Sequence, residues 1–365
     1  MIKKLILAGA ALALITSCKM ENPLLTESKA PFGAPEFDKI KTEHYLPAFE
    51  EGIKEGKAEI DAIVANPDEP TFENTIEAME HAGSKLNKVG GIFFNLMEAH
   101  TSDEMQVIAE QVSPMLTEYS MYVSLNEHLF KRVKAVYEKR NELGLDKDQM
   151  ILLEDSYKGF VRGGANLSEE DKSVYSKWAE ELSLATLQFS KNVLAATNAY
   201  TLHITDSTDL AGLPEYAKVM GAETAKEKGL EGWAFTLDYP SYGPFMKYST
   251  VRNLREDMWK AYNSRALGGE FDNSEVVKTI VDLRIKMANI LGYETWADYQ
   301  LEERMAKNRN TVNEFISQLL EPSMEFAKKD IESVFKYAKK NGFEGDKLMP
   351  WDFSFWSERY QEAEY

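Results

Sequence analysis

The sequence predicts a mainly α-helical protein with one small β element near residues 200–238. Three observations favour this fold class. Apolar residues recur at helical spacing through most of the chain, sequence signatures of helix starts are present, and only two short segments alternate apolar and polar residues with period two. Hydrophobic residues make up 44% of the 365 residues and aromatic residues 11%, so the chain has enough apolar side chains for a substantial core.

The N-terminus has the pattern of an export signal. Lys3 and Lys4 precede an apolar run from Leu5 to Ile15, which is too short to span a bilayer as a mature helix. The run ends in Ile15-Thr16-Ser17-Cys18, which resembles the lipobox of bacterial lipoproteins, where the cysteine carries the lipid and becomes the mature N-terminus. We therefore expect a lipoprotein signal peptide over 1–17 and lipidation of Cys18. The alternative is an ordinary secretory signal in which the cysteine stands by chance.

This signal predicts an exported, membrane-anchored lipoprotein that faces the periplasm or the cell surface. Residues 18–32 are polar, contain two prolines and lack periodicity, so we expect a flexible tether there. Lys19 follows the cysteine, which favours the outer membrane over retention in the inner membrane. Cys18 is the single cysteine, so packing alone must stabilise the helical part that we expect over 33–365.

Nearly every segment from Lys41 to Arg162 has helical periodicity. The segment Thr71-Phe72-Glu73-Asn74 marks a helix start. Pro114 predicts a kink in the helix expected over 103–119. The apolar stripe of that helix consists of Met105, Ile108, Ala109, Val112, Met115, Leu116 and Tyr119.

Two capping boxes mark later helices. Ser168-Glu169-Glu170-Asp171 predicts a helix that continues to about Ala195. Thr311-Val312-Asn313-Glu314 predicts another, which we expect to break at Pro322 and to be followed by a helix that ends near Gly342.

The period-two segments are 200–205 and 233–238. Both are rich in aromatic or β-branched residues and both are bounded by turn residues, so they predict a small sheet. Residues 214–228 between them have a helical pattern. Further helices are expected to begin near Asn253 and Glu275.

The charge balance excludes one class of partner. The chain has 42 basic and 60 acidic side chains, which gives a formal net charge of −18. A duplex nucleic acid would be repelled by such a field, so we expect no nucleic-acid partner.

A self-contained active site is not evident. The histidines are His44, His81, His100, His128 and His203, and none belongs to a His-Glu-x-x-His motif or an i, i+4 pair that could hold zinc on one helix face. Glu98, His100 and Asp103 form the nearest metal-like cluster, but they do not share a helix face. The chain contains no Gly-x-Ser-x-Gly elbow and no glycine-rich phosphate loop, and Cys18 is unavailable as a nucleophile once lipidated.

A series of short blocks nevertheless identifies a family. They are Tyr45-Leu46-Pro47-Ala48-Phe49, Pro70-Thr71-Phe72-Glu73-Asn74-Thr75, Leu210-Ala211-Gly212-Leu213-Pro214, Thr236-Leu237-Asp238-Tyr239-Pro240-Ser241-Tyr242, Asn253-Leu254-Arg255-Glu256 with Tyr262 and Arg265, Ala288-Asn289-Ile290-Leu291-Gly292-Tyr293, and Pro350-Trp351-Asp352. In this order the blocks resemble the thimet-oligopeptidase family of zinc metallopeptidases, in its peptidyl-dipeptidase Dcp branch. The resemblance runs from about Asn22 to the last residue.

The resemblance implies the multi-helical N-terminal half of a two-lobed, neurolysin-like fold with a deep channel. It also implies an enzyme that releases dipeptides from the C-termini of short peptides. In the family, one zinc ion is held by the two histidines of His-Glu-x-x-His and by a later glutamate, while the glutamate of the motif acts as general base.

The sequence departs from the family at this point, because the motif would lie about a hundred residues beyond Pro350-Trp351-Asp352. No catalytic or metal-binding residue can be assigned to this chain. We therefore expect zinc in the full-length enzyme and none in this chain, which would be inactive without a C-terminal catalytic half. The alternative is a non-catalytic peptide-binding or vestigial lipoprotein. Tyr239, Tyr242 and Arg265 are candidate channel residues, although they equally fit ordinary packing, and we expect exposed apolar surface over 349–365.

Overall fold

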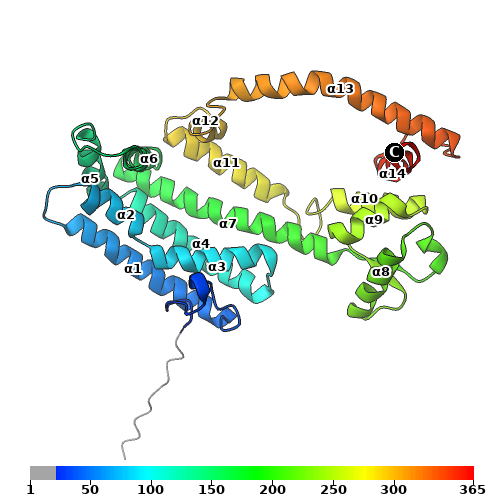
Figure 1. Ribbon diagram of the computed structural model, residues 1–365, viewed down its shortest axis with the longest axis horizontal. Coiled ribbons are helices and arrows are strands. Elements are labelled where there is room, and N and C mark those ends of the chain that lie inside the picture. Colours follow the sequence, from blue (N-terminus) through cyan, green and yellow to red (C-terminus); the bar gives the residue numbers. More distant parts are fainter. Residues whose placement is uncertain (1–21) are drawn as a thin grey trace, which may run out of the picture. The chain divides into compact units, whose positions relative to one another are not determined.

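The computed structural model describes residues 22–365, and the predicted signal peptide and Cys18 lie outside the described residues. The fold is mainly helical, with one two-stranded sheet in the described part of the chain, as the sequence predicts (Figure 1). The chain forms two compact units, which are described separately. The first unit comprises 22–112 and 126–158, and the second comprises 113–125 and 159–365.

The first unit is a group of helices preceded by two short 3-10 turns, η1 and η2. Its elements are η1 (Pro31–Gly33), η2 (Thr42–His44), α1 (Tyr45–Ala65), the π-helical turn η3 (Phe72–Glu77), α2 (Ala78–His81), α3 (Ser84–Ala99), α5 (Glu127–Glu138) and the larger parts of α6 (Lys147–Arg162) and, to residue 112, of α4 (Asp103–Ser124). The helix α4 continues through Pro114.

Aromatic side chains fill the contact between α1 and α3. Tyr45 and Phe49 of α1 both meet the ring of Phe93 edge to face, with ring centroids 5.0 and 5.4 Å apart. Gly52 allows the two helices to approach, because a β-carbon there would lie 3.1 Å from the α-carbon of Leu86. The apolar faces that the sequence predicts therefore meet in a dense core.

The start of η3 confirms the predicted helix signal at Thr71. The Thr71 hydroxyl accepts a hydrogen bond from the Asn74 backbone, and the Asn74 side chain accepts one in return from the Thr71 backbone. Arg132 of α5 is buried beneath this turn and donates to the carbonyl oxygens of Asn66 and Asp68 and to the side chain of Asn74. One buried guanidinium thus fixes the loop between α1 and η3.

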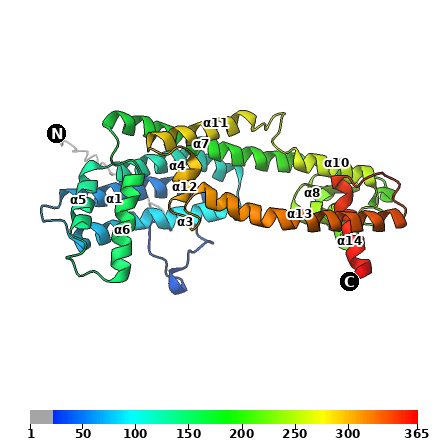
Figure 2. The same ribbon diagram turned by 90° about the horizontal axis from the view of Figure 1, so that it is seen from above.

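The second unit contains the long helix α7 and the elements that follow it. They are α7 (Glu169–Ala199), β1 (Leu202–Ile204), η4 (Ser207–Leu210), α8 (Glu215–Glu227), β2 (Trp233–Phe235), α9 (Tyr239–Tyr248), α10 (Arg252–Asn263), α11 (Ser274–Ile290), α12 (Trp296–Leu301), α13 (Arg309–Lys340) and α14 (Pro350–Glu364). The helix α11 packs along α7, as both views show (Figures 1 and 2).

The start of α7 confirms the predicted cap at Ser168. The Ser168 hydroxyl accepts from the Asp171 backbone, and the helix continues to Ala199, four residues past the expected end. The buried side chains of Tyr175 and Ala179 on α7 pack with Met287 of α11. This pairing forms the smaller apolar core of the unit.

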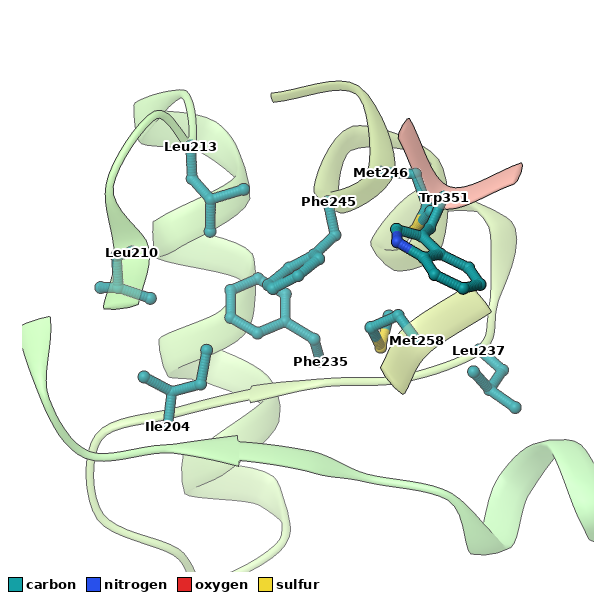
Figure 3. Close-up of a cluster of buried hydrophobic side chains, with 9 residues drawn as sticks. All are labelled: Ile204, Leu210, Leu213, Phe235, Leu237, Phe245, Met246, Met258 and Trp351. Carbon is teal, nitrogen blue, oxygen red and sulfur yellow. The ribbon is translucent and has the colours of Figure 1, made fainter. Parts of the chain in front are cut away.

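The sheet confirms the predicted β element, although each strand is only three residues long. The strands β1 and β2 are antiparallel, with Leu202 opposite Phe235 and Ile204 opposite Trp233. Side chains from β1, β2, η4, α9, α10 and α14 form the second core of the unit (Figure 3). The rings of Phe235 and Phe245 lie at its centre, 4.8 Å apart.

The helix α13 corrects two predictions. Its N-cap is Asn308, whose side chain accepts a hydrogen bond from the Thr311 backbone. The helix therefore begins at Arg309, whereas a cap at Thr311 would have started it three residues later, at Val312. It also continues without a break through Pro322 to Lys340. The residues around Pro322 are exposed, so water can satisfy the carbonyl group that the proline leaves without a helical partner.

More large apolar side chains are exposed on α13 than over 349–365, where Phe353 and Tyr365 are exposed. In the same segment, Trp351 and Phe355 of α14 are buried. Within residues 22–365, no helix combines the length and the hydropathy that a membrane-spanning segment needs.

Candidate functional site

The family-like blocks around residues 255 and 352 meet in the second unit. Arg255 of α10 is 2% exposed and Asp352 of α14 is fully buried. A guanidinium nitrogen of Arg255 lies 3.2 Å from an Asp352 carboxylate oxygen. Arg252 completes the cluster by donating to both oxygens of the same carboxylate, at 2.8 and 2.7 Å. Two blocks that lie far apart in the sequence are therefore joined by a buried ion pair.

Backbone groups satisfy the rest of the Arg255 side chain. Its Nε donates to the Trp351 carbonyl at 3.0 Å and another nitrogen donates to the Ser249 carbonyl at 2.8 Å. The guanidinium also lies 4.1 Å from the centre of the Phe355 ring. These contacts fasten the start of α14 to α10 and to the end of α9, as a strong charge-assisted network does.

Burial dominates the electrostatics of this cluster. Removal of the guanidinium from water lowers the pKa of Arg255 to about 10, although the neighbouring Asp352 carboxylate opposes that change. The positive charge of Arg252 acts in the same direction as burial. Two arginines share one carboxylate, so the cluster has an excess positive charge in a chain of formal net charge −18.

An open cavity of about 490 Å³ lies beside the cluster. Arg252 and Arg255 line it together with the aromatic side chains of Phe343, Phe355 and Trp356. The combination of apolar walls with a few convergent polar groups is typical of ligand sites. Glu344 also lines the cavity, so its rim carries both signs of charge.

Two of the candidate channel residues lie in a second cluster. The ring of Tyr242 stacks on Tyr262 with centroids 4.1 Å apart, and the Arg265 guanidinium lies 3.8 Å from the centre of the Tyr262 ring. Desolvation, assisted by the neighbouring Tyr262, raises the pKa of Tyr242 to about 12. Tyr239 is 72% exposed and does not belong to this stack, so the structure brings together only two of the three candidates.

Arg265 also lines an open cavity of about 420 Å³ with Tyr200 and Glu270. Its nitrogens donate to the Tyr262 carbonyl and, at 3.4 Å, to the Thr197 hydroxyl. Within the described chain no carboxylate forms an ion pair with this guanidinium. The stack and the cavity thus present aromatic rings together with the Arg265 guanidinium and the Glu270 carboxylate.

The histidines are dispersed. His44 is buried and its Nδ1 accepts from the Lys41 backbone, while His203 is exposed and its Nε2 lies 2.6 Å from the Glu231 carbonyl. His81, His100 and His128 are exposed on the first unit. No group of three or more His, Cys, Asp or Glu side chains in residues 22–365 is arranged to hold a metal ion. The described residues therefore do not fit a catalytic zinc.

Sequence reasoning did not anticipate the pairing of Arg252 and Arg255 with Asp352. A signal was available, since Arg255 and Asp352 both belong to the family-like blocks. The blocks single out these two positions as typical of the family, whereas only the fold shows that their side chains are in contact.

The comparisons with known proteins agree with the blocks. Residues 245–365 match the family described as peptidase family M3. The dipeptidyl carboxypeptidase of Escherichia coli (strain K12) is 34% identical over 346 residues, which are 94% of this chain and 51% of that protein. Oligopeptidase A of the same organism is 33% identical over 95% of this chain and 51% of its own length. A probable cytosolic oligopeptidase A of Arabidopsis thaliana is 31% identical over 94% of this chain and 49% of its own length.

The chain thus spans about half the length of the curated relatives it matches. Its ordered blocks, its mainly helical fold and these similarities agree with one another, and the chain belongs to peptidase family M3, the thimet-oligopeptidase family, in its dipeptidyl carboxypeptidase branch.

Proposed function

We propose that this chain is the N-terminal, non-catalytic half of a zinc peptidyl-dipeptidase that releases dipeptides from the C-termini of short peptides. The observation that carries the proposal is the similarity to dipeptidyl carboxypeptidase over 94% of the chain but only 51% of that relative. The remaining half would supply the His-Glu-x-x-His motif, the zinc and the general base. The described residues contain no metal-binding group, so no catalytic step is assigned to them.

The contribution of this half would be structural and substrate-facing. Arg255 and Asp352 hold α14 against α10. The stack of Tyr242 and Tyr262 with Arg265 offers aromatic faces and a positive charge to a short peptide. The proposed substrate class is therefore short, unfolded peptides.

The test joins this chain to the unmatched half of the Escherichia coli dipeptidyl carboxypeptidase. Dipeptide release from a short synthetic peptide is followed by mass spectrometry, with and without a zinc chelator. The joined protein should release dipeptides only when zinc is present, and the 365-residue chain alone should release none. The matched control replaces the glutamate of the supplied His-Glu-x-x-His motif with glutamine. Zinc-dependent release by the chain alone would refute the proposal.

A second candidate is a peptide-binding lipoprotein without catalysis. The open cavity beside Arg265, on a chain whose described part has no metal site, is the observation that favours it. It predicts micromolar binding of short peptides to the chain alone in calorimetry, which substitution of Arg265 by glutamine would weaken.

We also propose export and anchoring through a lipid on Cys18, on the strength of the lipobox-like sequence Ile15-Thr16-Ser17-Cys18. The outer membrane is the proposed location, because Lys19 follows the cysteine.

A further inference from the structure

The helix α13 has a long unpartnered segment. Every residue from Asn313 to Glu332 is exposed, whereas α13 touches α12 near its start and α14 near its end. Figures 1 and 2 show α13 running from α12 to α14. A helix of this kind normally depends on packing of its apolar face, because intrinsic propensity alone gives marginal stability.

The exposed segment is strongly amphipathic. Successive residues of an α-helix turn by about 100°, so apolar positions at i, i+3, i+4 and i+7 share a face. Glu321, Glu325 and Lys328 lie on the opposite face. The apolar face, which we call the α13 stripe, consists of Phe315, Ile316, Leu319, Leu320, Met324, Phe326 and Ile331, each 47% exposed or more.

The α13 stripe continues an interface that is already formed. Val334 and Ala338 extend the same helix face toward the C-terminal end of α13, and both are buried where α13 meets α14. Tyr337 and Phe343 also make ring contacts with Trp356 of α14. The face that packs on α14 at one end is therefore the face left open along the rest of the helix.

We propose that the α13 stripe is the docking surface for the half of the M3 molecule that lies outside the match, and that this half continues the contact begun by α14. The inference deepens the proposed function and rests on it. Two observations select this occupant: the continuity of the stripe with the α14 interface, and the relatives' length, which is about twice the matched portion. Exposed apolar side chains that gather on one face often mark a site of interaction with another chain or domain.

The test uses cysteine accessibility, with Cys18 replaced by serine. Leu319→Cys places a thiol in the stripe, and Glu321→Cys places one about 200° away around the helix. Maleimide labelling is located by peptide mapping in the chain alone and in the chain joined to the unmatched half of the Escherichia coli dipeptidyl carboxypeptidase. The same labelling is repeated with the two halves purified separately and mixed.

In the chain alone, both thiols should react at similar rates. With the other half present, Leu319→Cys should react at least about tenfold more slowly, while Glu321→Cys should change less than about twofold. Labelling of Leu319→Cys in the joined and mixed samples at the same rate as in the chain alone would overturn the proposal. Protection that appears in the chain alone and rises with its concentration would also overturn it, because the occupant would then be a second copy. Labelling does not depend on peptide cleavage, so this test can fail or succeed separately from the proposed function.

Discussion

Replacement of Asp352 by alanine tests the buried charge network that joins α10 to α14. The substitution removes the carboxylate that neutralises Arg255, which is 2% exposed and keeps only its two backbone hydrogen bonds. Loss of one partner of a buried ion pair costs about 3–5 kcal/mol. The two remaining bonds favour the lower end of that range, about 3 kcal/mol. Asp352 also accepts a hydrogen bond from the Met349 backbone, and loss of this N-terminal cap adds about 1 kcal/mol.

The expected total of about 4 kcal/mol corresponds to a fall of about 8–16 °C in the Tm of a unit of this size. The assay is thermal unfolding followed by near-UV circular dichroism, which reports the tryptophans around Trp351. Arg252→Ala should cost only about 1 kcal/mol, because Arg252 is partly exposed and Asp352 keeps Arg255 as a partner. Glu325→Ala, which breaks an exposed ion pair on α13, should change the stability by less than about 0.5 kcal/mol.

The double variant Arg255→Met with Asp352→Leu distinguishes the cause. Replacement of a buried ion pair by apolar residues is often neutral, so this variant should regain most of the lost Tm. The reasoning is refuted if Asp352→Ala unfolds within about 2 °C of the unmodified chain. It is equally refuted if the double variant is no more stable than Asp352→Ala, because the buried charge would then not be the cause.

Four further outcomes are expected. In urea unfolding, Gly212→Ala should destabilise the second unit by more than Gly268→Ala. Both glycines have positive φ, but only at Gly212 would a β-carbon lie 2.3 Å from a backbone oxygen. Equal losses of unfolding free energy in the two variants would contradict this. Arg132→Ala should lower the stability of the first unit by about 2–4 kcal/mol, because a buried side chain that donates three hydrogen bonds is lost. A measured change below about 1 kcal/mol would be the contrary result. The raised pKa of Tyr242 means that its stabilising contribution is complete below pH 10 and is lost between pH 10 and about 12. In a titration of tyrosine ionisation followed by absorbance at 295 nm, Tyr242→Phe should therefore remove part of the absorbance change at the highest pH values. An unchanged absorbance rise at those pH values would be inconsistent with this. When bacteria that express this protein are grown with radioactive fatty acid, Cys18→Ala should abolish the labelling of this protein. Persistent labelling would exclude lipidation at that position.

The elements that were predictable from sequence are those defined by local chemistry. Ser168 and Thr71 cap their helices as their patterns indicate, because a cap depends only on the next three residues. At α13 two cap patterns compete, and Asn308 forms the cap instead of Thr311. Pro322 does not end that helix, since its exposed surroundings leave water to satisfy the freed carbonyl group.

The candidate site was less predictable because its contacts are distant in sequence. Arg255 and Asp352 lie 97 residues apart, and neither helix pattern reveals its partner. Conversely, Tyr239 and Tyr242 lie on the same short helix, yet only Tyr242 enters the stack with Tyr262. Sequence patterns indicate which residues belong to the family blocks. The packing of α9, α10 and α14 determines which of their side chains are buried and which way these side chains point.

The most direct test of the central claim, that this chain is one half of an M3 peptidase, is the DNA sequence beyond the codon for Tyr365. Since 346 matched residues are 51% of the Escherichia coli relative, the account predicts that the reading frame continues for about three hundred codons and encodes His-Glu-x-x-His. A stop codon directly after Tyr365 would contradict the catalytic assignment and favour the peptide-binding lipoprotein.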